Sequence, residues 1–223
     1  MTPLAELTSA SLAFFGTHIA MSHPLRPLLM KLGEAGFQIV YNLVSLATLV
    51  WMVIAFRAAL PADLPGSGDI GWILATLLTL PALLLFLGSL TPRNPSMPLP
   101  GAATAARAGP AGVFTITRHP MMWGFALWAL SHLVLWWSWR TVIVALTILA
   151  LALIGARLQD AKKRVQMGEA WTTWEAQTSF HPRLTAFARI GWKGWAAAVL
   201  AWGVLTWVHW PLAGIPAGLL RWL

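Results

Sequence analysis

Long apolar stretches separated by short polar or basic segments run through the whole of this 223-residue chain. A helix that spans a bilayer needs about 20 mostly apolar residues. Six stretches meet or approach that length: Leu4–Met21, Phe37–Phe56, Ile70–Leu90, Met121–Trp137, Thr141–Leu158 and Gly194–Trp210. The pattern therefore predicts an all-α, polytopic integral membrane protein with about six transmembrane helices in a single domain over 1–223.

Two of these predicted helices need comment. The first is the weakest, because the polar residues Glu6, Thr8 and Ser9 shorten its apolar core. The segment after Trp210 is rich in proline and glycine, which argues against a seventh span.

Composition indicates a lipid environment. Hydrophobic residues make up 58% of the chain and charged residues only 10%, and the mean hydropathy is +0.68. Soluble domains carry about 25% charged residues. In hydrocarbon only helices and closed barrels satisfy every backbone polar group, and the long continuous apolar runs favour helices.

The basic residues predict the orientation of the chain. Twelve of the fifteen lysine and arginine residues lie at the ends of the first, third and fifth apolar stretches or in the loops after them, and only Arg57, Arg140 and Arg221 lie on the other side. Because basic loops stay in the cytoplasm, both termini should face outward. These loops account for the net charge of +8, so the sequence gives no support for nucleic-acid binding.

Two histidines lie inside apolar stretches, His18 in the first and His132 in the fourth. An ionisable side chain at membrane depth is costly and usually has a partner or a function. The absence of cysteine excludes disulfides, iron–sulfur clusters and thiolate-bound haem. A haem held by the two imidazoles is one interpretation, and neutral rings hydrogen-bonded to backbone carbonyls are the other.

Aromatic residues share helix faces with these histidines. Phe14 precedes His18 by four residues, and Phe125 and Trp128 precede His132 by seven and four. Such spacing places side chains on one face of a helix, so two of these faces could enclose a flat apolar macrocycle. Ordinary helix packing explains the spacing equally well. A shared iron also requires both rings at one depth, whereas the predicted boundaries put His18 near the cytoplasmic end.

A polar segment, Thr117-Arg118-His119-Pro120, stands immediately before the fourth apolar stretch. Proline suits the first position of a helix, and a helix N-terminus offers free amides and a partial positive charge. With Arg118 added, the segment predicts a site for a phosphate, a carboxylate or a haem propionate. Capping with lipid-headgroup contact is the alternative.

Two expectations concern the neighbouring polar segments. The Ala/Gly-rich segment from Gly101 to Gly112 should form a poorly structured connection. Glu169 and Glu175 should be exposed, solvated acids.

Three segments, in chain order, resemble the NnrU family of bacterial membrane proteins. They are FFGTHIAMS at 14–22, TRHPMMWGFALWALSH at 117–132 and GEAW at 168–171. The resemblance implies a multi-pass protein of the bacterial cytoplasmic (inner) membrane that is linked to nitric-oxide and denitrification metabolism. Its ligand would be nitric oxide or an apolar small molecule.

The NnrU family is similar to the 15-cis-zeta-carotene isomerases, which bind haem b through membrane histidines. That likeness implies haem b here, with His18 and His132 as metal ligands and Arg118, Phe14, Phe125 and Trp128 around the cofactor. The isomerases carry a cysteine where this chain has Ala129, which puts a thiolate switch and isomerase chemistry in doubt.

A wider resemblance connects Arg118-His119-Pro120 and Gly124 to isoprenylcysteine carboxyl methyltransferases and phospholipid methyltransferases. It implies an S-adenosylmethionine-dependent ancestor. The later acidic pair of those enzymes is reduced here to Gln159-Asp160. Three functions therefore stay open: a haem protein of nitric-oxide or redox metabolism, a haem-dependent polyene isomerase, and a methyltransferase relative.

Overall fold

A computed structural model describes residues 1–97 and 101–223 of the chain, and the regular structure in these ranges is helical. The α-helices are α1 (Pro3–Ser22), α2 (Arg26–Leu29), α3 (Gly33–Ala58), α4 (Gly68–Ser89), α5 (Ala102–Arg107), α6 (Pro120–Leu135), α7 (Trp139–Met167), α8 (Glu169–Gln177) and α9 (Trp192–Ala213). Short 3₁₀ turns are η1 (Met30–Leu32), η2 (Gly112–Thr115), η3 (Leu184–Arg189) and η4 (Gly218–Arg221). The all-α prediction is confirmed.

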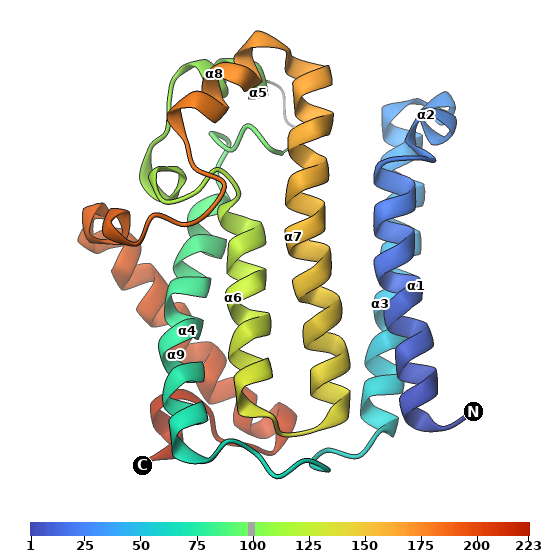
Figure 1. Cartoon of the computed structure of the whole chain (residues 1–223), viewed down its shortest axis with the longest axis vertical. Helices are drawn as coiled ribbons and strands as arrows, with labels where there is room; N and C mark the ends of the chain where they lie inside the picture. The colour runs from blue at the N-terminus through green and yellow to red at the C-terminus, as the bar shows by residue number, and fades with distance from the viewer. Residues whose placement is uncertain (98–100) are drawn as a thin grey trace.

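The long helices run side by side in a bundle (Figure 1). In the bundle α9 packs on α4, α4 on α6, α6 on α7, α7 on α1, and α1 on α3. Both chain termini lie at the same end, and α2, α5 and α8 lie at the other (Figure 1). This opposite end carries most of the basic residues, and it is called the cytoplasmic end below in keeping with the sequence-based orientation.

The chain is an integral, multi-pass membrane protein by the length and apolar character of its helices. Among the described residues, four helical stretches are long and apolar enough to cross a bilayer: Arg26–Ala58, Gly68–Ser89, Trp139–Met167 and Trp192–Ala213. Two more helices complete the bundle. Helix α6 is apolar but shorter than the four stretches, and the polar first turns of α1 lower the hydropathy of that helix. Large apolar side chains cover the outer faces of α3 and α9, where Leu43 is 62% exposed and Leu200 72% exposed.

A compact helical cap, formed by α5, η2, α8 and η3, covers the cytoplasmic ends of α4, α6 and α9. Its core contains Trp171 and Trp174, which are almost completely buried and pack with Phe114 and Ile116. Within this cap α5 packs against α8.

The prediction that Gly101 to Gly112 lacks regular structure is therefore wrong. Alanine is the strongest helix former, and the small side chain of Ala106 lets α5 pack closely, with no exposed surface at that residue. Gly101 and Gly109 flank α5 with φ of +84° and +83°, a conformation that glycine adopts at little cost.

Candidate functional site

Arg118 and His119 precede α6 in a short non-helical segment that the cap holds in place. The Arg118 amide donates to the carbonyl of Ser179 at 2.8 Å, and the Thr117 hydroxyl donates to the carbonyl of Phe180 at 2.7 Å. Pro120 then begins α6, as the sequence predicts. The segment between α8 and η3 therefore fixes where both side chains point.

Helix α7 supplies Asp160, the residue that pairs with Arg118 and His119. It has 29 residues, which is about 43 Å at about 1.5 Å per residue, whereas the hydrocarbon core is about 30 Å thick. Its last turns, beyond Leu158, therefore project past the membrane into the cap. Asp160 lies in these turns and faces the start of α6.

Asp160 forms a forked ion pair with Arg118. The guanidinium donates through Nε to both carboxylate oxygens at 3.1 Å and through Nη2 to Oδ2 at 2.8 Å. The two side chains are only 12% and 5% exposed. Fork-to-fork geometry of this kind is the strongest arrangement of an arginine with a carboxylate, so the anionic group held by Arg118 in this structure is a side chain of the protein.

His119 binds the same carboxylate from the other side. Its Nε2 donates to Asp160 Oδ1 at 2.7 Å, and its side chain is 0% exposed. In the neutral ring this fixes the proton on Nε2 and leaves a lone pair on Nδ1. Nδ1 is buried and has no hydrogen-bond partner among the described residues.

The charges around Asp160 hold it ionised. Burial favours the neutral acid, but hydrogen bonds from His119 and Arg118 outweigh burial and keep the pKa of Asp160 below its usual range. An ionised Asp160 in turn stabilises the Nε2–H tautomer of His119. This is the arrangement by which a carboxylate orients a histidine that acts as a base or as a metal ligand.

Glu175 on α8 extends the ion-pair network. It accepts from Arg164 Nε and Nη2 at 2.7 Å each, and its Oε1 lies 3.6 Å from Arg118 Nη2. The expectation that Glu175 is a solvated acid is wrong, because Arg164 at the end of α7 and Arg118 before α6 both bring a guanidinium group to it. Glu169 is exposed, as expected. Arg118, His119, Asp160 and Glu175 are called the Arg118 cluster below.

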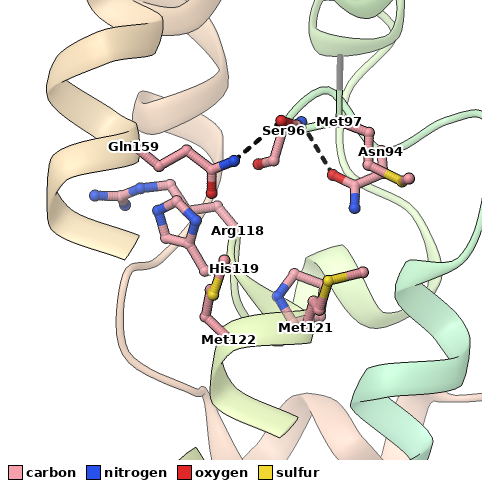
Figure 2. A pocket seen from close by; sticks show the side chains of 9 residues that line it. Asn94, Ser96, Met97, Arg118, His119, Met121, Met122 and Gln159 are labelled. Atoms are coloured by element: carbon pink, nitrogen blue, oxygen red, sulfur yellow. Dashed lines mark hydrogen bonds between the residues drawn. The ribbon is translucent and has the colours of Figure 1, made fainter. Parts of the chain in front are cut away.

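A pocket of about 230 Å³ opens beside the Arg118 cluster. It is lined by nine residues: Asn94, Ser96, Met97, Arg118, His119, Pro120, Met121, Met122 and Gln159. Figure 2 shows the side chains of Arg118, His119 and Gln159 along one side and Met97 and Asn94 on the opposite side. Gln159 donates to the carbonyl of Ser96 at 3.0 Å, which closes the pocket against the loop after α4.

His18 and His132 are not brought together. Their helices α1 and α6 each pack on α7. His18 lies four residues from the end of α1 that leads to α2, at the cytoplasmic end, and His132 lies three residues from the end of α6 that leads to α7, at the opposite end (Figure 1).

Each of the two rings bonds to its own helix. Nδ1 of His18 bonds to the carbonyl of Phe14 at 2.8 Å, and Nδ1 of His132 bonds to the carbonyl of Trp128 at 2.9 Å. The ring centroids of Phe14 and His18 are 4.2 Å apart, and those of Trp128 and His132 are 4.3 Å apart. The third aromatic candidate, Phe125, stacks edge-on against Phe86 of α4.

One haem bridging His18 and His132 does not fit this arrangement, because two axial ligands of one iron must face each other at one depth. The backbone hydrogen bonds through Nδ1 are those that the alternative interpretation expects. The same bonds leave Nε2 of each ring without a partner in the part of the chain that the structure describes. The described residues also contain no group of three or more histidine or acidic side chains placed to hold a metal ion.

Sequence reasoning missed Asp160 as the residue on which the cluster depends.

Comparison with known proteins adds one finding. The family model described as NnrU protein matches residues 6–217. No curated protein and no solved structure matches the chain.

Proposed function

This chain belongs to the NnrU family, and from that premise we propose that it is a bacterial inner-membrane protein of nitric-oxide and denitrification metabolism whose reactive group is His119. The observation that carries the proposal is the buried Nδ1 of His119, which has no partner among the described residues, while Asp160 holds Nε2 at 2.7 Å. An unpaired buried polar atom costs stability, so its presence in a folded protein points to a function.

The pocket sets the class of ligand. Its volume of about 230 Å³ lies below the roughly 300–1,000 Å³ of pockets for drug-sized molecules. The amide oxygen of Gln159 offers a hydrogen-bond acceptor, since its Nε2 is bonded to Ser96, and Met97, Met121 and Met122 offer apolar contact. We infer a small ligand that donates a hydrogen bond or a proton to Nδ1 and rests its apolar part on the methionines.

The experiment separates the lone pair of His119 from its structural role. In His119→Gln the side-chain amide takes the place of Nε2–H and still donates to Asp160, but no acceptor remains at the Nδ1 position. Complementation of a deletion strain that respires nitrate should fail with His119→Gln and succeed with the control His209→Gln. His209 is bonded to Ile215 at the opposite end of the bundle.

Two further measurements complete the complementation test. The amount of His119→Gln and of His209→Gln in the membrane should equal that of the wild-type protein, which shows that both variants fold. Arg118→Lys keeps the charge but loses the fork that binds Asp160, and it should lower complementation partially. Full complementation by His119→Gln would overturn the proposal.

Haem binding is a second candidate function. The supporting observations are the family likeness and the Nδ1 anchoring of both rings, since a metal-ligating histidine usually bonds through its other nitrogen to a carbonyl or carboxylate. In this arrangement His18 and His132 would each serve a separate iron, and Phe14 and Trp128 would pack beside them. Bound haem b would supply redox chemistry or binding of a diatomic gas.

A visible spectrum of the purified protein tests this candidate. His18→Ala and His132→Ala should each remove part of the Soret absorbance, and His209→Ala should remove none. Absence of the band in the wild-type protein contradicts the candidate. Complete loss in either single variant would mean that the two rings share one iron, which contradicts the proposal of two separate irons.

The wider resemblance adds a test for the methyltransferase alternative. A methyltransferase relative would bind S-adenosylmethionine beside the Arg118 cluster. Equilibrium dialysis with labelled S-adenosylmethionine should then show binding that His119→Gln weakens and His209→Gln does not. Failure to bind removes this alternative and leaves the two candidates above unaffected.

A further inference from the structure

A second and larger cavity lies on the other side of the cap. It has a volume of about 940 Å³ and runs between α4, α5, η2 and the first turns of α9. We call it the α4–α9 groove. None of the residues that line it belongs to the Arg118 cluster, so it is a separate site.

The walls of the groove are apolar and small. Leu84 and Leu87 come from α4, Gly194 and Ala197 come from the first turns of α9, and Ile190 comes from the turn between η3 and α9. Gly194 and Ala197 are three residues apart on α9 and share one face, and the Ile190 side chain lies against Gly194, so the three residues form one continuous strip along the groove. This strip continues the apolar surface that α4 and α9 present to lipid.

One charged side chain stands at the cytoplasmic end of the groove. Arg93 is the only charged residue among the described residues that line it. Arg93 is exposed and follows the end of α4 by four residues, with Thr91 beside it and Thr104 on α5 across the groove. The mouth therefore offers a cation and hydroxyl groups, and no described acid competes for them.

The groove crosses the membrane–water boundary. Trp192, the first residue of α9, is 75% exposed, and exposed tryptophan at a helix end marks the headgroup level. The apolar strip continues from this level into the hydrocarbon, whereas Arg93 lies on the cytoplasmic side. An occupant must therefore have an apolar body and a negatively charged end.

We propose that the α4–α9 groove binds one anionic phospholipid, with an acyl chain along the strip formed by Ile190, Gly194 and Ala197 and its phosphate against Arg93. Basic pockets between helices on the cytoplasmic side are a recurrent form of headgroup recognition. The groove lies within the roughly 300–1,000 Å³ range of ligand pockets. Charge complementarity favours an anionic over a zwitterionic lipid.

The experiment measures lipid retention. The protein is purified in detergent, incubated with mixed vesicles of phosphatidylglycerol and phosphatidylcholine at equal amounts, re-isolated and examined by native mass spectrometry. The wild-type protein should retain one phosphatidylglycerol in preference to phosphatidylcholine. Arg93→Ala should reduce this preference about five-fold, the factor that corresponds to about 1 kcal/mol for one basic residue near a membrane surface.

Matched controls locate the site. Arg107→Ala removes an exposed arginine of α5 that does not line the groove, and the preference should stay unchanged. Ala197→Trp fills the strip and should abolish retention, whereas Leu200→Trp, on the outer face of α9, should not. Ala108→Trp, at the end of the short helix α5, blocks the groove without altering the bundle.

Each result has one meaning. Equal retention by Ala197→Trp, Ala108→Trp and Leu200→Trp would show that lipid binds elsewhere and would overturn the proposal. Equal preference in Arg93→Ala and Arg107→Ala would show that Arg93 does not hold the phosphate, which would also overturn it. Preferential retention of phosphatidylcholine by the wild-type protein would do the same.

Discussion

Asp160 on α7 and Arg118 before α6 are 42 positions apart in the chain and meet in a forked ion pair, with a closest N–O distance of 2.8 Å. The pair connects the membrane bundle to the cap, because Arg118 is also fixed through its backbone to Ser179. It also sets the orientation of His119, which donates to the same carboxylate. Stability and function of the Arg118 cluster therefore depend on one side chain of α7.

Asp160→Asn should destabilise the protein strongly. The variant leaves the guanidinium of Arg118 buried with a neutral amide as its partner, and breaking one side of a buried ion pair costs about 3–5 kcal/mol. Thermal unfolding in detergent, followed by circular dichroism, should show a clearly lower midpoint. Asp69→Asn, the same chemical change at an exposed position of α4, should shift the midpoint little, and equal shifts in the two variants would contradict the structural role of Asp160.

Acidification should destabilise the cytoplasmic end of the bundle through His23. Burial lowers the pKa of His23 below its usual value of 6.5, and the positive charges of Lys162 and Arg26 lower it further. A group with a depressed pKa binds its proton more readily in the unfolded state. Stability is therefore fully present above pH 6.5 and falls as the pH drops through the folded-state pKa.

The corresponding measurement compares unfolding midpoints of the wild-type protein and His23→Gln between pH 8 and pH 5, a window that spans the ordinary histidine pKa of 6.5, below which the pKa of His23 is lowered. Above pH 6.5 the pH slopes should be the same. Below it the wild-type midpoint should fall faster, because the glutamine cannot take up a proton. Parallel curves throughout the range would show that His23 does not titrate in a charged environment.

Hydropathy was sufficient to predict the bundle. The predicted spans Phe37–Phe56 and Thr141–Leu158 lie inside α3 and α7, because burial in lipid requires apolar runs of the observed length. It did not predict where α7 ends. Lysine, arginine and glutamine are good helix formers, so the helix continues past Leu158 to Met167 while its composition becomes polar.

The Arg118 cluster was predictable only in part. Pro120 and the helix start are local signals, and they placed Arg118 and His119 correctly at the beginning of α6. The pairing with Asp160 is a tertiary contact between two helices, and spacing along the chain carries no sign of it. One available signal was an acid in a chain with 7 acidic and 15 basic residues, within a segment predicted to lie at the same membrane face. The other was the methyltransferase resemblance, in which Gln159-Asp160 stands in place of an acidic pair.

The predicted separation of His18 and His132 in depth was also a usable signal. The boundaries of the apolar stretches put His18 near the cytoplasmic end, and the structure has it there, with His132 at the opposite end. The shared resemblance to haem-binding relatives could not reveal this, since motif matching compares residue types and not their positions in the bundle.

The orientation of the protein can be measured directly because the chain contains no cysteine. Positively charged loops stay in the cytoplasm, which puts Glu169 on α8 inside the cell and Leu223 outside. Both positions are exposed, Leu223 at 98%, so a single cysteine at either one is chemically accessible. A membrane-impermeant maleimide should label Leu223→Cys on intact cells, and it should label Glu169→Cys only after the membrane is permeabilised. The wild-type protein gives the background in both conditions.

Labelling of Glu169→Cys on intact cells would show the reverse orientation, with the Arg118 cluster outside the cell. Labelling of neither variant before permeabilisation would contradict an external C-terminus.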